Sequence, residues 1–75
     1  MAMTLYFSRH VRRRMKWRRI TEKEVQSVLE KPDKITDSIK NRKNALAIVG
    51  VRLIKVTYRE EHNKRVIVTV VDKTR

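Results

Sequence analysis

The sequence predicts an α+β domain of two layers, in which two N-terminal helices lie on one face of an antiparallel sheet in the order β-α-α-β-β-β. Three observations support this fold class. The chain has 75 residues, the size of one small domain, and 40% of them are hydrophobic, enough for a core. Helix-start signals occur in the first third, and segments rich in β-branched residues follow the only proline, Pro32. We therefore expect a single domain over residues 1–75.

The first two elements follow from the residues around Ser8. Residues 3–7 are short, aromatic and β-favouring, which predicts a strand that ends at Ser8. The Ser8 hydroxyl suits the N-cap of a helix over residues 9–18. Within that helix Val11 and Met15 are four residues apart, which places both on the side that faces the core.

The second helix has a start signal and a stop signal. Thr21 and Glu24 have the spacing of a capping box, in which each side chain accepts the backbone N–H of the other residue. Pro32 ends the helix near Lys31, because proline disfavours helical backbone in the residue before it. The apolar residues at helical spacing between these points are expected to be buried: Val25, Val28 and Leu29.

Strands are expected after Pro32 at residues 45–49, 51–59 and 65–71, with a further candidate at residues 34–40. Gly50, the only glycine, turns the first of these strands back into the second. A polar hairpin loop at residues 60–64 leads into residues 65–71. That last segment is so rich in β-branched side chains that we expect a central strand.

The charge of the chain is large and unevenly placed. Twenty basic and eight acidic side chains leave a net charge of +12. Residues 1–21 contain no acid and seven of the bases: Arg9, Arg12, Arg13, Arg14, Lys16, Arg18 and Arg19. Charge gathered in one segment favours a binding face for a polyanion such as RNA or DNA.

Several functional classes are excluded or disfavoured by what the sequence lacks. The absence of cysteine excludes disulfides, cysteine-based zinc sites and thiol nucleophiles. No metal-ligand spacing joins His10 to His62, and His62 is expected in a solvated turn. No apolar run approaches the roughly 18 residues of a membrane span, and the N-terminus lacks a signal-peptide core. We expect a cytoplasmic protein with no metal, no cofactor and no membrane partner.

Within the basic helix, His10, Arg14 and Arg18 form an i, i+4, i+8 row beside the core-facing side. Such a row suits phosphate chemistry, because guanidinium groups hold phosphate oxygens and imidazole exchanges a proton near neutral pH. The alternative is structural: His10 packs or caps the helix start, and the arginines solvate the helix.

Other side chains are candidates for binding nucleic acid without chemistry. Trp17 can stack on an exposed base, or it can cover the rim of the core. Tyr58 is a further hydrogen-bond donor on the sheet. The remaining candidates are all basic: Arg9, Arg12, Arg13, Lys16 and Arg19 on the first helix and its end, and Arg52, Arg59 and Arg75 beyond it.

Residues 8–33 contain a set of short motifs: Ser8-Arg9-His10, Arg14-Met15, Arg18, Ile20-Thr21, Val25 and Leu29-Glu30-Lys31-Pro32-Asp33. In these residues the segment resembles a family of small prokaryotic domains of uncharacterised function. That family is similar to BrnT and, more remotely, to the RelE/ParE toxins, many of which are ribonucleases held by an antitoxin. The resemblance implies the β-α-α-β-β-β fold, and it matches the family's histidine and two arginines to His10, Arg14 and Arg18. This sequence departs from the family pattern at Arg19, where the family has glycine. The turn between the two helices therefore lacks the residue that most easily takes a positive φ.

The resulting hypothesis is an RNA-binding, toxin-like protein that cleaves RNA without a metal, as part of a toxin–antitoxin system. His10 would act as general base or acid, while Arg14 and Arg18 would hold the scissile phosphate. The expected partners are RNA, free or ribosome-bound, and an acidic antitoxin. Two alternatives stay open: a non-catalytic basic module that binds nucleic acid or an acidic protein, and a ParE-like inhibitor of a protein target.

Overall fold

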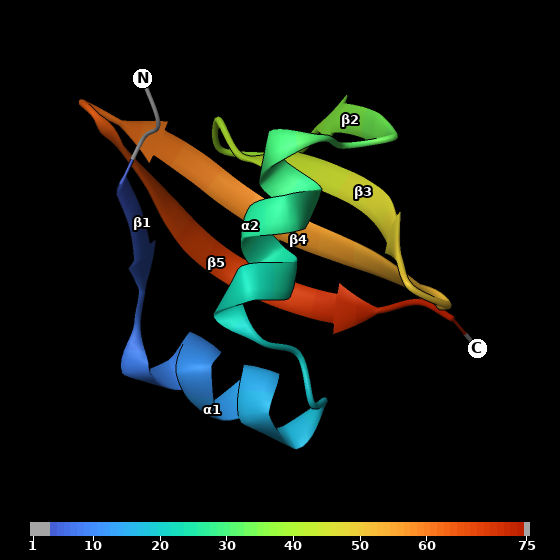
Figure 1. The fold of residues 1–75 in the computed structure, drawn as a ribbon. Coiled ribbons are helices and arrows are strands. Elements are labelled where there is room, and N and C mark those ends of the chain that lie inside the picture. The colour runs from blue at the N-terminus through green and yellow to red at the C-terminus, as the bar shows by residue number, and fades with distance from the viewer. Residues whose placement is uncertain (1–3, 75) are drawn as a thin grey trace.

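The computed structural model describes residues 4–74, which form two helices and one five-stranded sheet (Figure 1). The strands lie in the order β1-β5-β4-β3-β2 across the sheet. Along the chain the elements are β1 (Thr4–Phe7), α1 (Arg9–Trp17), α2 (Glu22–Glu30), β2 (Lys34–Asp37), β3 (Lys43–Val49), β4 (Arg52–Glu61) and β5 (Lys64–Asp72). Neither helix is long and apolar enough to cross a membrane.

The sheet is mixed, so the prediction of an antiparallel sheet was wrong for one strand. β1 pairs parallel with β5, with Phe7 opposite Ile67, whereas the pairs among β2, β3, β4 and β5 are antiparallel. Tight hairpin turns force consecutive strands to run in opposite directions. No hairpin joins β1 to β5, because both helices and three strands separate them in the sequence, and their relative direction is therefore free.

The strands also differ from their expected bounds. The candidate at residues 34–40 is a real strand, β2, but ends at Asp37, so four strands follow the helices instead of three. The hairpin loop expected at residues 60–64 shrinks to His62 and Asn63, with His62 at φ 54°. β5 pairs with β1 on one side and with β4 on the other, so the prediction of a central strand for this segment is confirmed.

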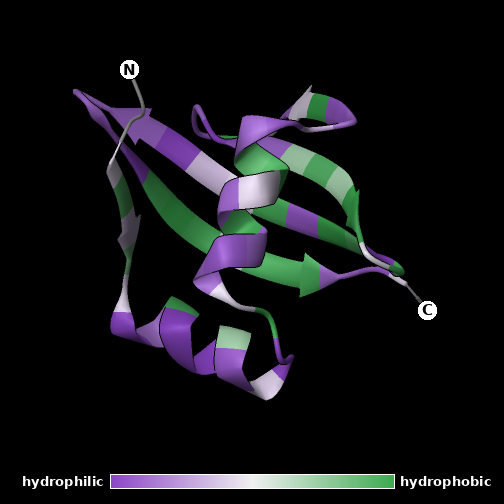
Figure 2. Ribbon diagram, viewed as in Figure 1, coloured by the Kyte–Doolittle hydropathy of each residue, from purple (hydrophilic) through white to green (hydrophobic). Residues whose placement is uncertain are grey.

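Both helices contribute to one core on a single face of the sheet. In Figure 1, α2 crosses in front of the sheet, and α1 lies beyond the end of β1. Figure 2 shows α1 as hydrophilic along most of its length and the strands as largely hydrophobic. The buried apolar residues form one cluster: Phe7, Val11, Met15, Ile20, Val25, Val28, Leu29, Ala45, Ala47, Ile54, Val56, Tyr58, Ile67 and Val70.

An irregularity in the β4–β5 register lets β5 direct two apolar side chains inward. Val56 lies opposite Val70, but Tyr58 lies opposite Ile67, so β5 holds one extra residue between these pairs. Strict alternation would place Ile67 and Val70 on opposite faces, because they are three residues apart. The bulge turns both toward the helices, where their side chains are fully buried.

The helix starts confirm the predicted caps. The Ser8 hydroxyl accepts the Val11 backbone N–H at 3.2 Å. In α2 the Thr21 hydroxyl accepts the Glu24 N–H at 3.2 Å, and the Glu24 carboxylate accepts the Thr21 N–H at 2.9 Å. Each cap satisfies N–H groups that have no partner within the helix.

The end of α1 is a Schellman motif with arginine where glycine is usual. The Ile20 N–H bonds to the Met15 carbonyl at 2.9 Å, and the Arg19 N–H bonds to the Lys16 carbonyl at 3.2 Å. Arg19 has a φ of 56°, the left-handed conformation that this motif requires. In a residue other than glycine this conformation brings Cβ too close to the carbonyl oxygen, which raises the conformational energy.

Candidate functional site

The solvent side of α1 is a strongly basic surface. Val11 and Met15 are its two buried residues, and every other residue of the helix is exposed. A shallow hollow open to solvent lies on this side, lined by Arg9, Arg12, Arg13, Lys16 and Trp17. We call these five residues the α1 basic face. Arg12 also forms an ion pair with Glu22 at the start of α2, while the other three cations make no ion pair with the residues that the structure describes.

Trp17 stands out on this face because its side chain is almost fully in solvent. It is 85% exposed, the highest exposure among the aromatic residues that the structure describes. Of the two alternatives for Trp17, covering the rim of the core is therefore excluded, and its indole ring is accessible to a partner. An indole left in water at the last residue of a charged helix contributes little packing energy to the fold.

The His10, Arg14 and Arg18 row lies on the side of α1 toward β5. The guanidinium of Arg18 donates a hydrogen bond to the Val70 carbonyl of β5 at 3.2 Å. β1 pairs only with residues 64–67, so Val70 belongs to the part of β5 that extends past β1. Arg18 thus satisfies a carbonyl at an open sheet edge, a structural use that a purely catalytic assignment does not account for.

His10 and Arg14 are exposed, and their side chains make no hydrogen bond or ion pair with any residue between Thr4 and Thr74. His10 and Arg14 lie on α1 and Arg18 is its C-cap residue, so the three keep the i, i+4, i+8 spacing. They do not line either of the two hollows described for this chain. A general acid or base is most effective where water is excluded around it, and these side chains are in open solvent.

Arg52, predicted to bind nucleic acid, lies at a junction between both helices and the sheet. Its guanidinium donates to the carbonyls of Arg18 at 3.3 Å and Arg19 at 3.1 Å, and pairs with Glu24 of α2. Asp72 of β5 lies 3.8 Å away. The Arg52 side chain thus joins the end of α1, the start of α2 and the last strand, and it is only 25% exposed.

Burial, the contacts with Thr21 and the contact with Arg52 all act on the pKa of Glu24. Partial burial raises the pKa of that carboxyl group. Hydrogen bonds from Thr21 and Arg52, together with the Arg52 charge, outweigh this effect and hold the pKa of Glu24 below its ordinary value of 4.5. Glu24 therefore stays ionised at neutral pH and holds the junction together.

Tyr58 and Arg59 do not extend the basic surface of the helix. Tyr58 is 3% exposed on the inner face of the sheet, with the Arg65 guanidinium 5.4 Å above its ring centre. Its burial follows from its phase with Ile54 and Val56, a signal that the sequence contained. Arg59 lies on the opposite face and pairs with Glu61. Arg75 lies outside the described residues.

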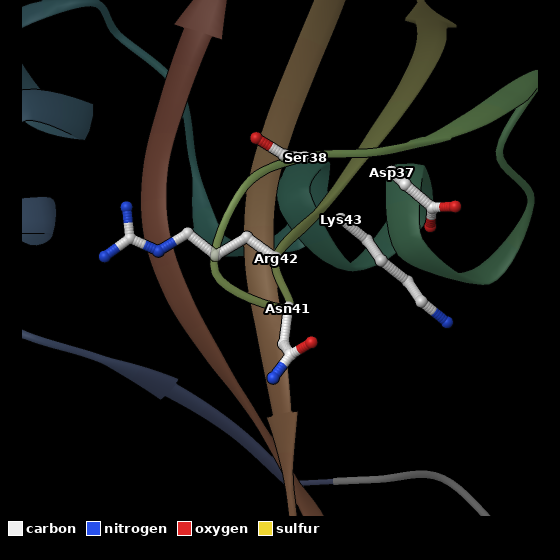
Figure 3. Close-up of a pocket in the computed structure, with 5 residues that line it drawn as sticks. All are labelled: Asp37, Ser38, Asn41, Arg42 and Lys43. Atoms are coloured by element: carbon white, nitrogen blue, oxygen red, sulfur yellow. The ribbon is translucent and has the colours of Figure 1, made fainter.

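A second hollow lies at the turn between β2 and β3, lined by Asp37, Ser38, Asn41, Arg42 and Lys43. Figure 3 shows that these side chains point away from one another, with Arg42 on one side of the loop and Asp37 and Lys43 on the other. They form no convergent set for a ligand or a reaction. Among residues 4–74, no three His, Asp or Glu side chains gather as a metal site would require.

A family model described as a domain of unknown function, DUF4258, matches residues 7–72 of the chain. The chain belongs to the DUF4258 family. The match extends from the last residue of β1 to the last residue of β5 and so covers the α1 basic face, the Arg52 junction and nearly all of the sheet. No curated protein and no solved structure matches the chain significantly. The predicted membership of a small uncharacterised family is confirmed, whereas the likeness to BrnT and RelE stays a prediction.

Proposed function

We propose that this DUF4258 protein binds single-stranded nucleic acid through the α1 basic face. The observation that carries the proposal is Trp17, an indole 85% exposed among Arg9, Arg12, Arg13 and Lys16. The cations attract the phosphates, and the ring stacks on a base. Both contacts are available at once, because they lie on the same side of one short helix.

A single strand suits this surface better than a duplex. In a duplex the faces of the bases are stacked on one another, whereas in a single strand they are open to an aromatic side chain. Such stacking contributes about 1–3 kcal/mol per base and needs no particular base. Arginine and lysine supply the sequence-independent part of the affinity, which falls as the salt concentration rises.

Binding has stronger support than cleavage. The groups assigned to catalysis, His10 and Arg14, are exposed, and Arg18 donates to a backbone carbonyl. A binding surface needs only open cations and an accessible ring, and the α1 basic face has both. Metal-independent cleavage of RNA by His10 remains a prediction and is tested separately below.

The proposal can be tested with the intrinsic fluorescence of the protein, because Trp17 is the only tryptophan. A 12-nucleotide single-stranded RNA, the same sequence as single-stranded DNA and a duplex of equal length are each titrated into the protein at low salt. We expect quenching of Trp17 by the single strands and weaker binding of the duplex. The RNA and DNA arms show whether the sugar contributes.

Two lysines provide a matched pair of variants. Lys16→Ala removes a cation from the α1 basic face, and Lys23→Ala removes the same charge from the exposed side of α2. For Lys16→Ala we expect weaker binding and a salt dependence, d log K/d log[salt], that is less steep by about 0.7, the value for one lost phosphate contact with a single strand. For Lys23→Ala the affinity and the salt dependence should change only by the general effect of one lost charge.

Three results would contradict the proposal. Binding without any change in Trp17 fluorescence would place the nucleic acid elsewhere on the protein. Equal losses in Lys16→Ala and Lys23→Ala would show that only the net charge matters. Binding of an acidic polypeptide such as polyglutamate, with no binding of any oligonucleotide, would identify a protein partner instead.

A further inference from the structure

The face of the sheet opposite the helices is open to solvent and carries its own cations. Both described helices pack on the other face, where the core lies. The strand register places four cations on the open face: Lys34, Lys55, Arg59 and Lys64. Among the strand residues of this face, the register also places the carboxylate of Glu61, which pairs with Arg59. The open face is therefore net positive, like α1.

Tyr6 is the aromatic residue of the open face. It lies on β1 opposite Val66 of β5, and it is 51% exposed. The ammonium group of Lys64 lies 5.5 Å from the centre of the Tyr6 ring, within the range of a cation–π contact. Tyr6 and Lys64 thus place an exposed ring beside a cation on the sheet, and on α1 the exposed ring of Trp17 lines the same hollow as four cations.

A short stretch of chain joins the two aromatic sites, because β1 leads directly into α1. β1 ends at Phe7, and α1 begins at Arg9 after the single residue Ser8. The backbone path from Tyr6 to Trp17 is about 20 Å long, by the rise of a strand and of a helix. The Arg18–Val70 hydrogen bond shows that one side of α1 faces the edge of β5, and His10 and Arg14 lie on that same side. Exposed cations therefore extend from the α1 basic face toward the edge of the sheet.

We propose that the open face of the sheet around Tyr6 is a second contact site for the same single strand. In this arrangement the nucleic acid lies on α1, passes the edge formed by β1 and β5, and stacks a further base on Tyr6 while Lys64 contacts a neighbouring phosphate. This inference rests on the proposed function of α1 and deepens it, because it defines a minimum length of ligand. Charge complementarity and the exposed ring select a polyanion with bases as the occupant of the open face.

The experiment compares a short and a long ligand, single-stranded oligouridylates of 4 and 12 nucleotides carrying a terminal fluorophore. Their affinities are measured by anisotropy for the wild type and for Tyr6→Val, which removes the ring but keeps a side chain that favours a strand. Tyr6→Phe keeps the stacking surface. Ile48→Thr is the matched control, since Ile48 is 66% exposed on β3 of the same face, away from β1. Circular dichroism confirms that each variant is folded.

We expect Tyr6→Val to weaken binding of the 12-mer by roughly five- to 150-fold, the effect of losing one stacked base. The 4-mer, which occupies α1 alone, should bind Tyr6→Val as it binds the wild type, with the same Trp17 quenching. Tyr6→Phe and Ile48→Thr should keep the affinity of the wild type for both ligands.

The failure of this inference differs from the failure of the proposed function. If the 12-mer binds Tyr6→Val as tightly as the wild type while Trp17 is still quenched, the second site is refuted and α1 binding stands. If Tyr6→Val weakens the 4-mer and the 12-mer equally, the ring acts through the fold and the second site is also refuted. If neither oligonucleotide binds the wild type, both proposals are overturned.

Discussion

Replacing Arg52 by methionine tests whether this arginine holds the fold together or binds nucleic acid. Arg52→Met keeps most of the aliphatic stem and removes the guanidinium group, so the packing of the stem changes little. It removes the hydrogen bonds to the Arg18 and Arg19 carbonyls and the ion pair with Glu24. We expect a folded protein of lower stability whose affinity for nucleic acid is unchanged.

The size of the effect follows from the contacts. The two carbonyls share one Nη1 donor, at 3.3 and 3.1 Å, and together contribute about 1 kcal/mol. The pair with Glu24, whose two side chains are 25% and 21% exposed, contributes about 1 kcal/mol more. Asp72, at 3.8 Å, adds at most a few tenths. The sum of about 2 kcal/mol is a large part of the roughly 4–11 kcal/mol expected for a domain of this size.

Urea unfolding followed by circular dichroism measures this loss directly, and the same loss lowers the melting temperature by roughly 8–16 °C. Arg52→Lys should lose nearly as much, because a single ammonium group cannot reach carbonyls and carboxylates in the fork geometry of guanidinium. A loss below about 0.5 kcal/mol would refute the structural role. A tenfold drop in the affinity of folded Arg52→Met for the 12-mer would show that Arg52 contacts the nucleic acid after all.

Three further predictions concern the same region. Arg19→Gly should stabilise the protein by about 0.5–1 kcal/mol, because relief of the left-handed strain exceeds the added chain entropy of glycine; a lower urea midpoint would contradict this. The Glu24 contribution to stability should be complete above pH 4.5 and be lost as the pH falls through the lowered pKa of the folded state. The difference in unfolding free energy between the wild type and Glu24→Gln should therefore shrink on acidification, and a difference independent of pH would refute the assignment. If the protein cleaves RNA in the presence of EDTA, His10→Ala should abolish cleavage and leave Trp17 quenching nearly unchanged; cleavage that survives in the variant would exclude His10 as the base.

Local signals in the sequence predicted the helix starts and most of the strands. The Ser8 cap and the Thr21–Glu24 capping box depend on residues three positions apart, and such contacts are visible in the sequence itself. The alternation of Ile54, Val56 and Tyr58 also indicates that Tyr58 points inward, but we predicted Tyr58 on the binding surface. Its burial was thus available from the sequence.

Contacts between distant residues decided the rest. Arg52 donates hydrogen bonds to Glu24 and Arg18, which lie 28 and 34 positions away in the sequence. No local pattern therefore distinguishes this arginine from one on the surface. The parallel pairing of β1 has the same origin, because its register with β5 joins the two ends of the chain. Likewise, Arg18 and Arg14 are equivalent in the helical pattern, yet only Arg18 reaches the open edge of β5.

By itself, the sequence determined where the helices begin, which segments form strands and that the positive charge gathers on the first helix. These properties depend on residue type and on spacings of a few residues, so they do not require knowledge of the fold. The tertiary structure decided the direction of β1, the exposure of Trp17 and Tyr6, and which arginines hold the fold together and which remain free for a ligand. Those properties depend on which distant segments pack together, since burial and hydrogen-bond partners exist only once the chain is folded.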